Sequence, residues 1–157
     1  EIRRTLNGRM NQGNAIILFN LGTTYLEAGE EDLTIQLFKE ALQVELGNDS
    51  SPQELIKLLE LLGLIYQRRG ELGDALSCLS QAQAVAKNAV LPLVSGRLLN
   101  MMGNIHLRRA NTPEMMRCFT EASRIFRTIP IHDGVLAISG YGFYCLSKCH
   151  PECASAA

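Results

Sequence analysis

One short signature recurs four times along the chain, and its near-constant spacing limits the folds that the chain can adopt. In each copy an apolar residue precedes a glycine, and a further residue follows three positions after the glycine. The copies read Leu21-Gly22 with Tyr25, Leu62-Gly63 with Tyr66, Met102-Gly103 with His106, and Tyr141-Gly142 with Cys145, so successive glycines are 41, 40 and 39 residues apart. A regular period of this length predicts stacked supersecondary units with a continuous core. Such an array has no single active-site cleft, so function is expected on a surface.

Size and charge restrict the class of protein and its partners. The chain has 157 residues, the size of one domain, and 46% hydrophobic residues are enough to bury a substantial core. The net charge of −1 gives no bulk attraction to nucleic acid or to an anionic membrane, so no nucleic-acid partner is expected. No apolar run approaches the roughly 18 residues that a membrane span needs, so no membrane span is expected. Five cysteines, an odd number, favour a reducing, intracellular and cytoplasmic setting over a disulfide framework.

Each copy of the signature lies within a helix–turn–helix pattern. Apolar residues recur at helical spacing up to Gly29 or Gly70, which break the helix, and the period then resumes. In the third copy Ala110 stands in place of the turn glycine. The glycine of the first helix is expected where the two helices of a pair cross closely.

Helix starts support the same division. Ser51-Pro52-Gln53-Glu54 has a capping hydroxyl, a proline at the first helical position and a glutamate that can reach back to the cap. Thr112-Pro113-Glu114 is expected to open a helix in the same way, and Pro92 fits the first turn of a helix that begins near Val90. One domain, 1–157, is therefore divided into repeats at about 15–48, 56–89 and 96–129, with a partial repeat or capping helix at 133–149, the end of a preceding helix at 1–10 and a C-terminal tail at 150–157.

This pattern resembles the tetratricopeptide repeat (TPR), in which a Trp, a Leu-Gly pair and a Tyr on the first helix precede Ala and Phe positions on the second. The chain departs from it in lacking Trp and in having Thr34 and Met115 at small-residue positions of the second helix. Its spacing near 40 residues is similar to the extended repeats of kinesin light chains and the Pins/LGN adaptors. The resemblance implies an all-α fold, a right-handed α-solenoid of antiparallel helix-turn-helix repeats.

The resemblance also implies that the first helices line a concave groove that binds a partner peptide or protein. Polar side chains expected in this groove could pair with the backbone and acidic side chains of an extended segment. They are Asn20, Thr23, Lys57, Glu60, Arg68, Arg97, Asn100, Asn104 and Arg108. The alternative interpretation is that these residues are solvated helix positions with no ligand.

Other chemistry is weakly supported. Cys145, Cys149, His150 and Cys153 could in principle hold zinc, but their spacing matches no usual zinc site, and a tail with free thiols is the better interpretation. Cys78 and Cys118 occupy equivalent positions in successive second helices, where packing explains them. His106 is expected at the edge of the core. We expect no catalytic residue, no metal, no cofactor and no enzymatic activity.

Two functions are therefore expected from the sequence. The first is a scaffold or adaptor that binds a protein or peptide partner, with acidic residues, in the groove of a repeat array. The second is a structural subunit or spacer built permanently into a larger assembly, for which exposed apolar ends would be needed.

Overall fold

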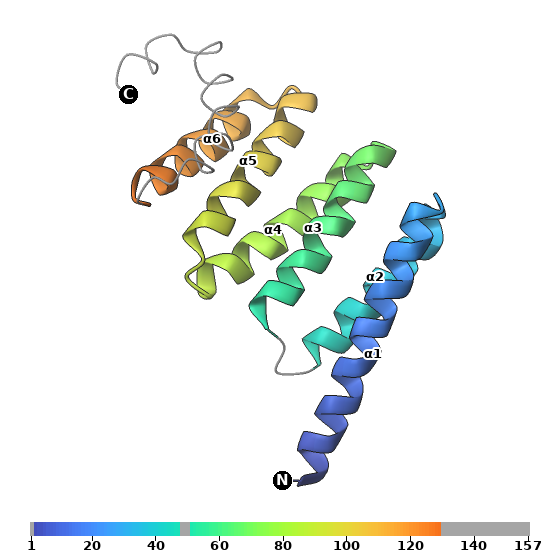
Figure 1. The fold of residues 1–157 in the computed structure, drawn as a ribbon. Helices are drawn as coiled ribbons and strands as arrows, with labels where there is room; N and C mark the ends of the chain where they lie inside the picture. The colour runs from blue at the N-terminus through green and yellow to red at the C-terminus, as the bar shows by residue number, and fades with distance from the viewer. Residues whose placement is uncertain (1, 48–50, 130–157) are drawn as a thin grey trace. The chain divides into compact units, whose positions relative to one another are not determined.

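The computed structural model describes residues 2–47 and 51–129, with side chains from residue 13 onward, and every regular element in these ranges is a helix. The helices are α1 (Ile2–Glu27), α2 (Glu31–Leu46), α3 (Pro52–Arg69), α4 (Leu72–Asn88), α5 (Pro92–Arg108) and α6 (Thr112–Arg127) (Figure 1). The chain forms two compact units, Glu1–Cys78 and Leu79–Ala157, with the boundary inside α4. The all-helical fold class, built from consecutive helical hairpins, is thus confirmed.

The N-terminal part of the chain differs from expectation. Residues 1–10 were expected to form the end of a separate preceding helix, but α1 runs unbroken from Ile2 to Glu27 and includes Gly8 and Gly13. A glycine inside a helix costs only about 1 kcal/mol relative to alanine, so it need not end one. The expected helix at 133–149 and the tail at 150–157 lie outside the described residues.

In the first unit, α1 and α2 pack through a contact between glycine and phenylalanine. A Cβ atom placed on Gly22 would lie 2.5 Å from Cε1 of Phe38, whose side chain is fully buried. The Phe38 ring stacks on Phe19 of α1 with ring centroids 5.6 Å apart. Thr34, at the position where a small residue was expected, is also fully buried, and its hydroxyl lies within hydrogen-bond distance of the carbonyls of Glu30 (2.9 Å) and Gly22 (3.3 Å). The predicted close crossing at Gly22 is therefore confirmed.

The second unit repeats this contact between α5 and α6. A Cβ atom on Gly103 would lie 2.6 Å from Cε1 of Phe119, and one on Gly96 would lie 2.7 Å from Cζ of Phe126. Leu99 and Cys118 are buried in the same hairpin core. Two glycines on α5 thus admit two phenyl rings of α6, which holds the helices close over most of their length.

The ends of α1, α3 and α5 share one backbone geometry. Gly29, Gly70 and Ala110 all have left-handed φ angles, of 83°, 80° and 53°. In each case the next residue donates its N–H to the carbonyl five positions earlier, as in Glu30 to Tyr25 (2.9 Å), which is the Schellman arrangement. Val90 ends α4 in the same way, with φ 54°. Ala110 therefore does take the role of the turn glycine, at the steric cost of a Cβ atom.

Two of the three predicted helix starts are confirmed, with Pro92 in the first turn of α5, and the capping residue of the third needs correction. Ser51 caps α3 as expected and accepts a hydrogen bond from the N–H of Glu54 (3.3 Å). For α6 the capping residue is Asn111 and not Thr112, because the Asn111 side-chain oxygen accepts the N–H of Glu114 (3.4 Å). Helix α5 begins at Pro92, since the left-handed Val90 cannot belong to it.

Replacing Gly22 by alanine should destabilise the chain, whereas the same change at Gly13 should not. The new methyl group at position 22 would overlap the buried Phe38 ring, so we expect a loss of about 2 kcal/mol after the gain in helix propensity is counted. No atom lies within 4 Å of a Cβ placed on Gly13 of the same helix, so Gly13→Ala should gain up to about 1 kcal/mol. Urea unfolding followed by circular dichroism measures both, and equal effects at the two sites would contradict the close crossing.

Relief of left-handed strain should stabilise the second unit. Val90 is β-branched and 81% exposed, so Val90→Gly removes a disfavoured conformation without removing a core side chain, and we expect about 1 kcal/mol of added stability. Ala110→Gly should give a smaller gain, because alanine is less crowded there and glycine adds entropy to the unfolded chain. The reverse change, Gly70→Ala, should lower the thermal midpoint, and a rise in that midpoint would show that the turn is not under this constraint.

Candidate binding surfaces

The first unit brings two of the predicted groove residues together. Asn20 of α1 and Lys57 of α3 are exposed and line one hollow of about 240 Å³. The other lining residues come from α1, α2 and α3 and are Ala15, Ile16, Phe19, Glu45, Glu54 and Leu58. This hollow is smaller than the roughly 300–1,000 Å³ of small-molecule pockets, so its size suits one side chain of a larger partner.

Charge and aromatic surface meet at this hollow. The Lys57 ammonium group lies 4.4 Å from the centroid of the Phe19 ring, within the range of a cation–π interaction. Phe19 is itself held by its stacking on Phe38, so the α1–α2 hairpin core positions the lysine. Glu45 is buried and Glu54 is exposed, and both carboxylates border the same hollow. A partner would therefore meet one ammonium group and two carboxyl groups beside an apolar surface.

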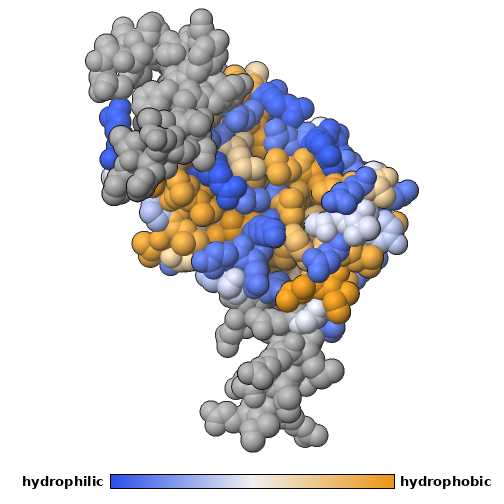
Figure 2. Space-filling model, viewed as in Figure 1, coloured by the Kyte–Doolittle hydropathy of each residue, from blue (hydrophilic) through white to orange (hydrophobic). Residues whose placement is uncertain are grey.

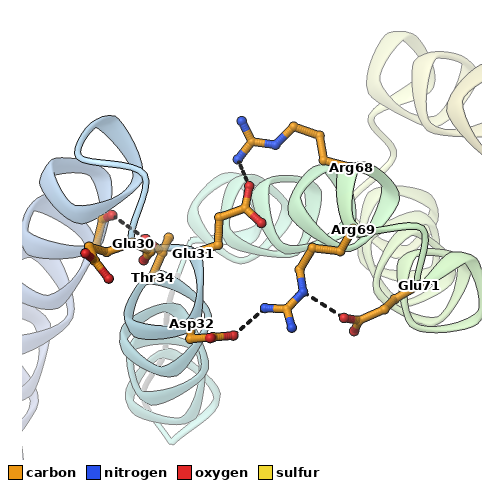
Figure 3. Close-up of polar contacts among 8 residues, drawn as sticks. Glu30, Glu31, Asp32, Thr34, Arg68, Arg69 and Glu71 are labelled. Atoms are coloured by element: carbon orange, nitrogen blue, oxygen red, sulfur yellow. Dashed lines mark hydrogen bonds and ion pairs between the residues drawn. The ribbon is translucent and has the colours of Figure 1, made fainter.

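The other predicted residues of this unit are engaged elsewhere. The Thr23 hydroxyl donates to the carbonyl of Asn20 within α1 (2.7 Å). Arg68 pairs with Glu31 of α2 at 2.8 Å, as Figure 3 shows. Glu60 is half-buried. None of these three residues lines the hollow of Asn20 and Lys57.

Arg68 belongs to a set of ion pairs that joins the start of α2 to the end of α3. Its neighbour Arg69 pairs with Asp32 of α2 and with Glu71 (2.7 Å), just before α4 (Figure 3). Exposed pairs of this kind each contribute only about 0–1 kcal/mol, so their main effect is to orient the helix ends. Arg68 therefore has a structural role within the first unit as well as the predicted binding role.

In the second unit the predicted residues lie along α5 but differ in exposure. Arg108 is exposed, and Arg97 and Asn104 are half-buried. Asn100 is 9% exposed and ranks among the buried polar residues, so its amide is not open to a partner as the groove hypothesis expected. The Asn104 side-chain oxygen is enclosed without a hydrogen-bond partner in the described structure. Helical spacing alone could not reveal this, since it does not show how deeply each position is covered.

His106 is a core-edge histidine, as predicted, and its environment favours the neutral ring. Burial is the main cause that lowers the pKa of His106, and the nearby Arg109 and Arg117 lower it further, against an opposing effect of Glu114. Its Nδ1 atom is enclosed and has no hydrogen-bond partner among the described residues. Protonation would therefore place a charge in a partly desolvated site.

Of the two cysteines in the described part of the chain, Cys118 is buried in the α5–α6 core and Cys78 is half-buried, which fits the expected packing role. Burial raises the pKa of the Cys78 and Cys118 thiols, so both favour the protonated form. The described residues contain no cluster of potential metal ligands. Cys145, Cys149, His150 and Cys153 lie outside the described residues. Among the described helices, none combines the length and the apolar character of a membrane span.

Sequence reasoning missed a larger hollow in the second unit. It has a volume of about 960 Å³ and lies among α4, α5 and α6. Its lining includes Leu99 and Met102 of α5, which the sequence analysis did not assign to any binding surface. The only available signal was the 3–4–3 spacing of Pro92, Ser95, Leu99 and Met102, which places them on one face of α5.

Comparison with known proteins supports the fold. Neither the comparison with family models nor that with curated proteins finds a match to this sequence. The crystal structure of aspartyl phosphate phosphatase F from Bacillus subtilis is similar, with a TM-score of 0.73 and 14% identity, over 93% of this chain and 37% of that chain. The crystal structure of BtubC (BKLC) from P. vanneervenii is similar with a TM-score of 0.69 and 17% identity, over 96% of this chain and 66% of that chain.

These likenesses concern the fold alone, because both identities are low. This chain spans little more than a third of the phosphatase, so the activity named for that protein does not transfer with the fold. Together with the pairwise packing of α1 with α2 and of α5 with α6, they define the chain as a helical-repeat protein.

The neutral state of His106 should make stability depend on pH. A histidine whose folded-state pKa is lowered contributes stability above its ordinary pKa of 6.5, and this stability is lost as the pH falls through the folded-state pKa. We expect the free energy of unfolding to fall below pH 6.5 more steeply in the wild type than in His106→Gln. Urea unfolding at several pH values measures the free energy of unfolding of both proteins. In the difference between the two curves, the contributions of the other titrating groups cancel. Parallel curves would show that His106 is protonated as easily in the folded chain as in the unfolded one.

Proposed function

We propose that this chain is a protein-binding module whose hairpins are extended tetratricopeptide repeats, and that it holds a partner segment along its first helices. The proposal includes no enzymatic activity and an intracellular setting. It is supported by the period near 40 residues and by the glycine–phenylalanine crossings at Gly22 and Gly103. The two similar structures support the helical fold and do not indicate which ligand this chain binds.

The hollow between α1 and α3 is the observation that carries the proposal. It places Asn20 and Lys57, which come from the first helices of two successive hairpins, on the rim of one site. An amide and an ammonium group at such a rim can bind the backbone and a carboxylate of a peptide, while Phe19 provides apolar contact. Because Phe19 and Lys57 are already positioned against each other, little ordering of the protein would oppose binding.

The same reasoning indicates the chemistry of the partner. Among the proposed binding residues, Lys57, Arg68, Arg97 and Arg108 are basic and Glu60 is acidic. A partner segment with acidic side chains is therefore favoured over a basic one. Within the second unit, the exposed Arg108 and the partly exposed Arg97 would favour an acidic segment in the same way, whereas the buried Asn100 would act by supporting α5.

A second function, that of a permanent subunit of a larger assembly, is favoured by apolar residues on α1. Ile16, Ile17 and Leu21 are 55%, 64% and 43% exposed and lie within about one and a half turns of one another. Figure 2 likewise shows apolar residues at the surface among hydrophilic ones. An apolar surface on one helix suits a neighbouring protein that is always present.

Lys57→Glu should abolish partner binding, whereas Lys39→Glu should not. The two lysines form a matched pair, since the ammonium group of each lies over an aromatic ring. Lys57, on the first helix α3, lies over Phe19, and Lys39, on the second helix α2, lies 5.6 Å from the centroid of the Tyr66 ring. We expect affinity purification with mass spectrometry from native lysate to recover a set of proteins with the wild type and with Lys39→Glu. The same set should be missing from the Lys57→Glu sample, because charge reversal repels an acidic segment.

Circular dichroism of all three proteins checks that they fold. Partners that remain bound to Lys57→Glu would contradict the first-helix site. If those partners are instead lost from a variant with Ile17→Glu and Leu21→Glu, the apolar surface of α1 makes the contact, and the subunit function replaces the adaptor function.

A further inference from the structure

The large hollow of the second unit is a trough lined by α4, α5 and α6. Its floor is one face of α5, and its two sides are the end of α4 and the middle of α6. The residues are Pro92, Ser95, Leu99 and Met102 on α5; Ser80, Gln83, Ala86 and Lys87 on α4, with Val90 and Leu91 after it; and Met116, Arg117, Cys118, Thr120, Glu121, Arg124 and Ile125 on α6. The floor from Pro92 to Met102 is roughly 15 Å long, or about three helical turns.

The inside of the trough is apolar and adaptable. Leu99 lies at its floor, and the half-buried Met102 and Met116 border it from two helices. Methionine side chains are flexible and polarisable, so they can fit apolar side chains of different shapes. Gln83 adds a polar group to this lining. Its amide N–H donates to the Ser95 hydroxyl (2.8 Å), whereas its side-chain oxygen is enclosed and has no hydrogen-bond partner in the described structure.

The rim of the trough is basic. Lys87, Arg117 and Arg124 line it, against a single acidic residue, Glu121. The Arg117 and Arg124 side chains are 73% and 69% exposed although they pair with Glu114 and Glu121 on their own helix. Exposed pairs of this kind are weak, so both guanidinium groups can also reach an acidic partner.

We propose that this trough binds an acidic amphipathic helix of a partner protein, which lays an apolar stripe on Met102 and Met116 and directs Asp or Glu side chains at Lys87 and Arg124. The length of about three turns, the apolar interior and the basic rim together match this mode of recognition. The trough is formed by the second helices α4 and α6 over α5, so it is separate from the first-helix site of Asn20 and Lys57. The inference therefore does not depend on the proposed function.

The proposal can be tested with a synthetic probe and the full chain. The probe is a fluorescein-labelled peptide of about four helical turns, with leucine at every third or fourth position and glutamate on both sides of that stripe. We expect saturable binding in fluorescence anisotropy. The variant with Lys87→Glu and Arg124→Glu should bind it roughly tenfold or more weakly. A second peptide, with lysine in place of each glutamate, should prefer this variant over the wild type.

Two control variants locate the site. Arg127→Glu changes an exposed arginine on α6 that does not line the trough, so it should leave binding of the probe unchanged. Arg108→Glu changes the proposed first-helix surface and should also leave it unchanged. Loss of binding with Arg108→Glu alone would assign the probe to the first-helix site and overturn the trough proposal. Circular dichroism confirms that each variant folds.

Three further outcomes would also overturn the proposal. The first is the absence of saturable binding by either peptide. The second is a dimer of the full chain that the variant with Lys87→Glu and Arg124→Glu converts to monomer in analytical ultracentrifugation, because a second copy would then occupy the trough. The third is an intramolecular lysine cross-link between Lys87 and Lys148, which would indicate occupation by the C-terminal segment of the chain itself.

Discussion

The contact between a glycine on one helix and a phenylalanine ring on the next determines the rest of this structure. At Gly22 and Gly103 the missing Cβ atom leaves the space that the rings of Phe38 and Phe119 fill, and both rings are fully buried. Because closely packed cores do not deform continuously, this contact fixes how near the helices of a hairpin lie. The distance between the two helices then determines which helix faces remain outside the hairpin core. In the first unit, the ring of Phe38 stacks on the ring of Phe19, and the ammonium group of Lys57 lies over the Phe19 ring.

The parts of the fold that depend on local chemistry could be predicted from the sequence, and those that depend on coverage by other helices could not. Helical periodicity identified the hairpins. The Ser51 cap could be recognised because a serine followed by a proline and, three positions on, a glutamate is typical of a helix start. Asn111 and Thr112 could both cap a helix, so only the actual hydrogen bond to Glu114 decides between them. The continuity of α1 was missed because residues 1–10 were assigned to the end of a preceding helix, whereas the glycines at positions 8 and 13 only weaken a helix. The burial of Asn100 and the trough among α4, α5 and α6 depend on how helices pack against one another, and the spacing of residues within one helix does not show this.

The two candidate surfaces belong to different units and differ in kind. The hollow at Asn20 and Lys57 is small and has a fixed cation beside an aromatic ring, so it selects for one side chain in one place. The trough in the second unit is about four times larger in volume and is lined by flexible methionines, so it selects for a stripe of apolar residues and for the sign of the flanking charge. A helical hairpin can carry both, since its core occupies only the face between its two helices. Exposed residues on either side can therefore change without affecting the glycine–phenylalanine contact.

The second unit contains several departures from ideal local structure. Both non-glycine residues with left-handed backbone in the described chain, Val90 and Ala110, belong to it. So do the enclosed side-chain atoms of Gln83, Asn104 and His106 that have no hydrogen-bond partner there, each of which costs about 1–3 kcal/mol of desolvation. Strain and unsatisfied polar groups persist where the surrounding packing is strong enough, and two glycine–phenylalanine contacts along α5 provide that packing. Gln83 and Val90 both line the trough. A ligand that donates a hydrogen bond to Gln83 would therefore recover part of a cost that the free protein already bears, and its affinity would gain from it.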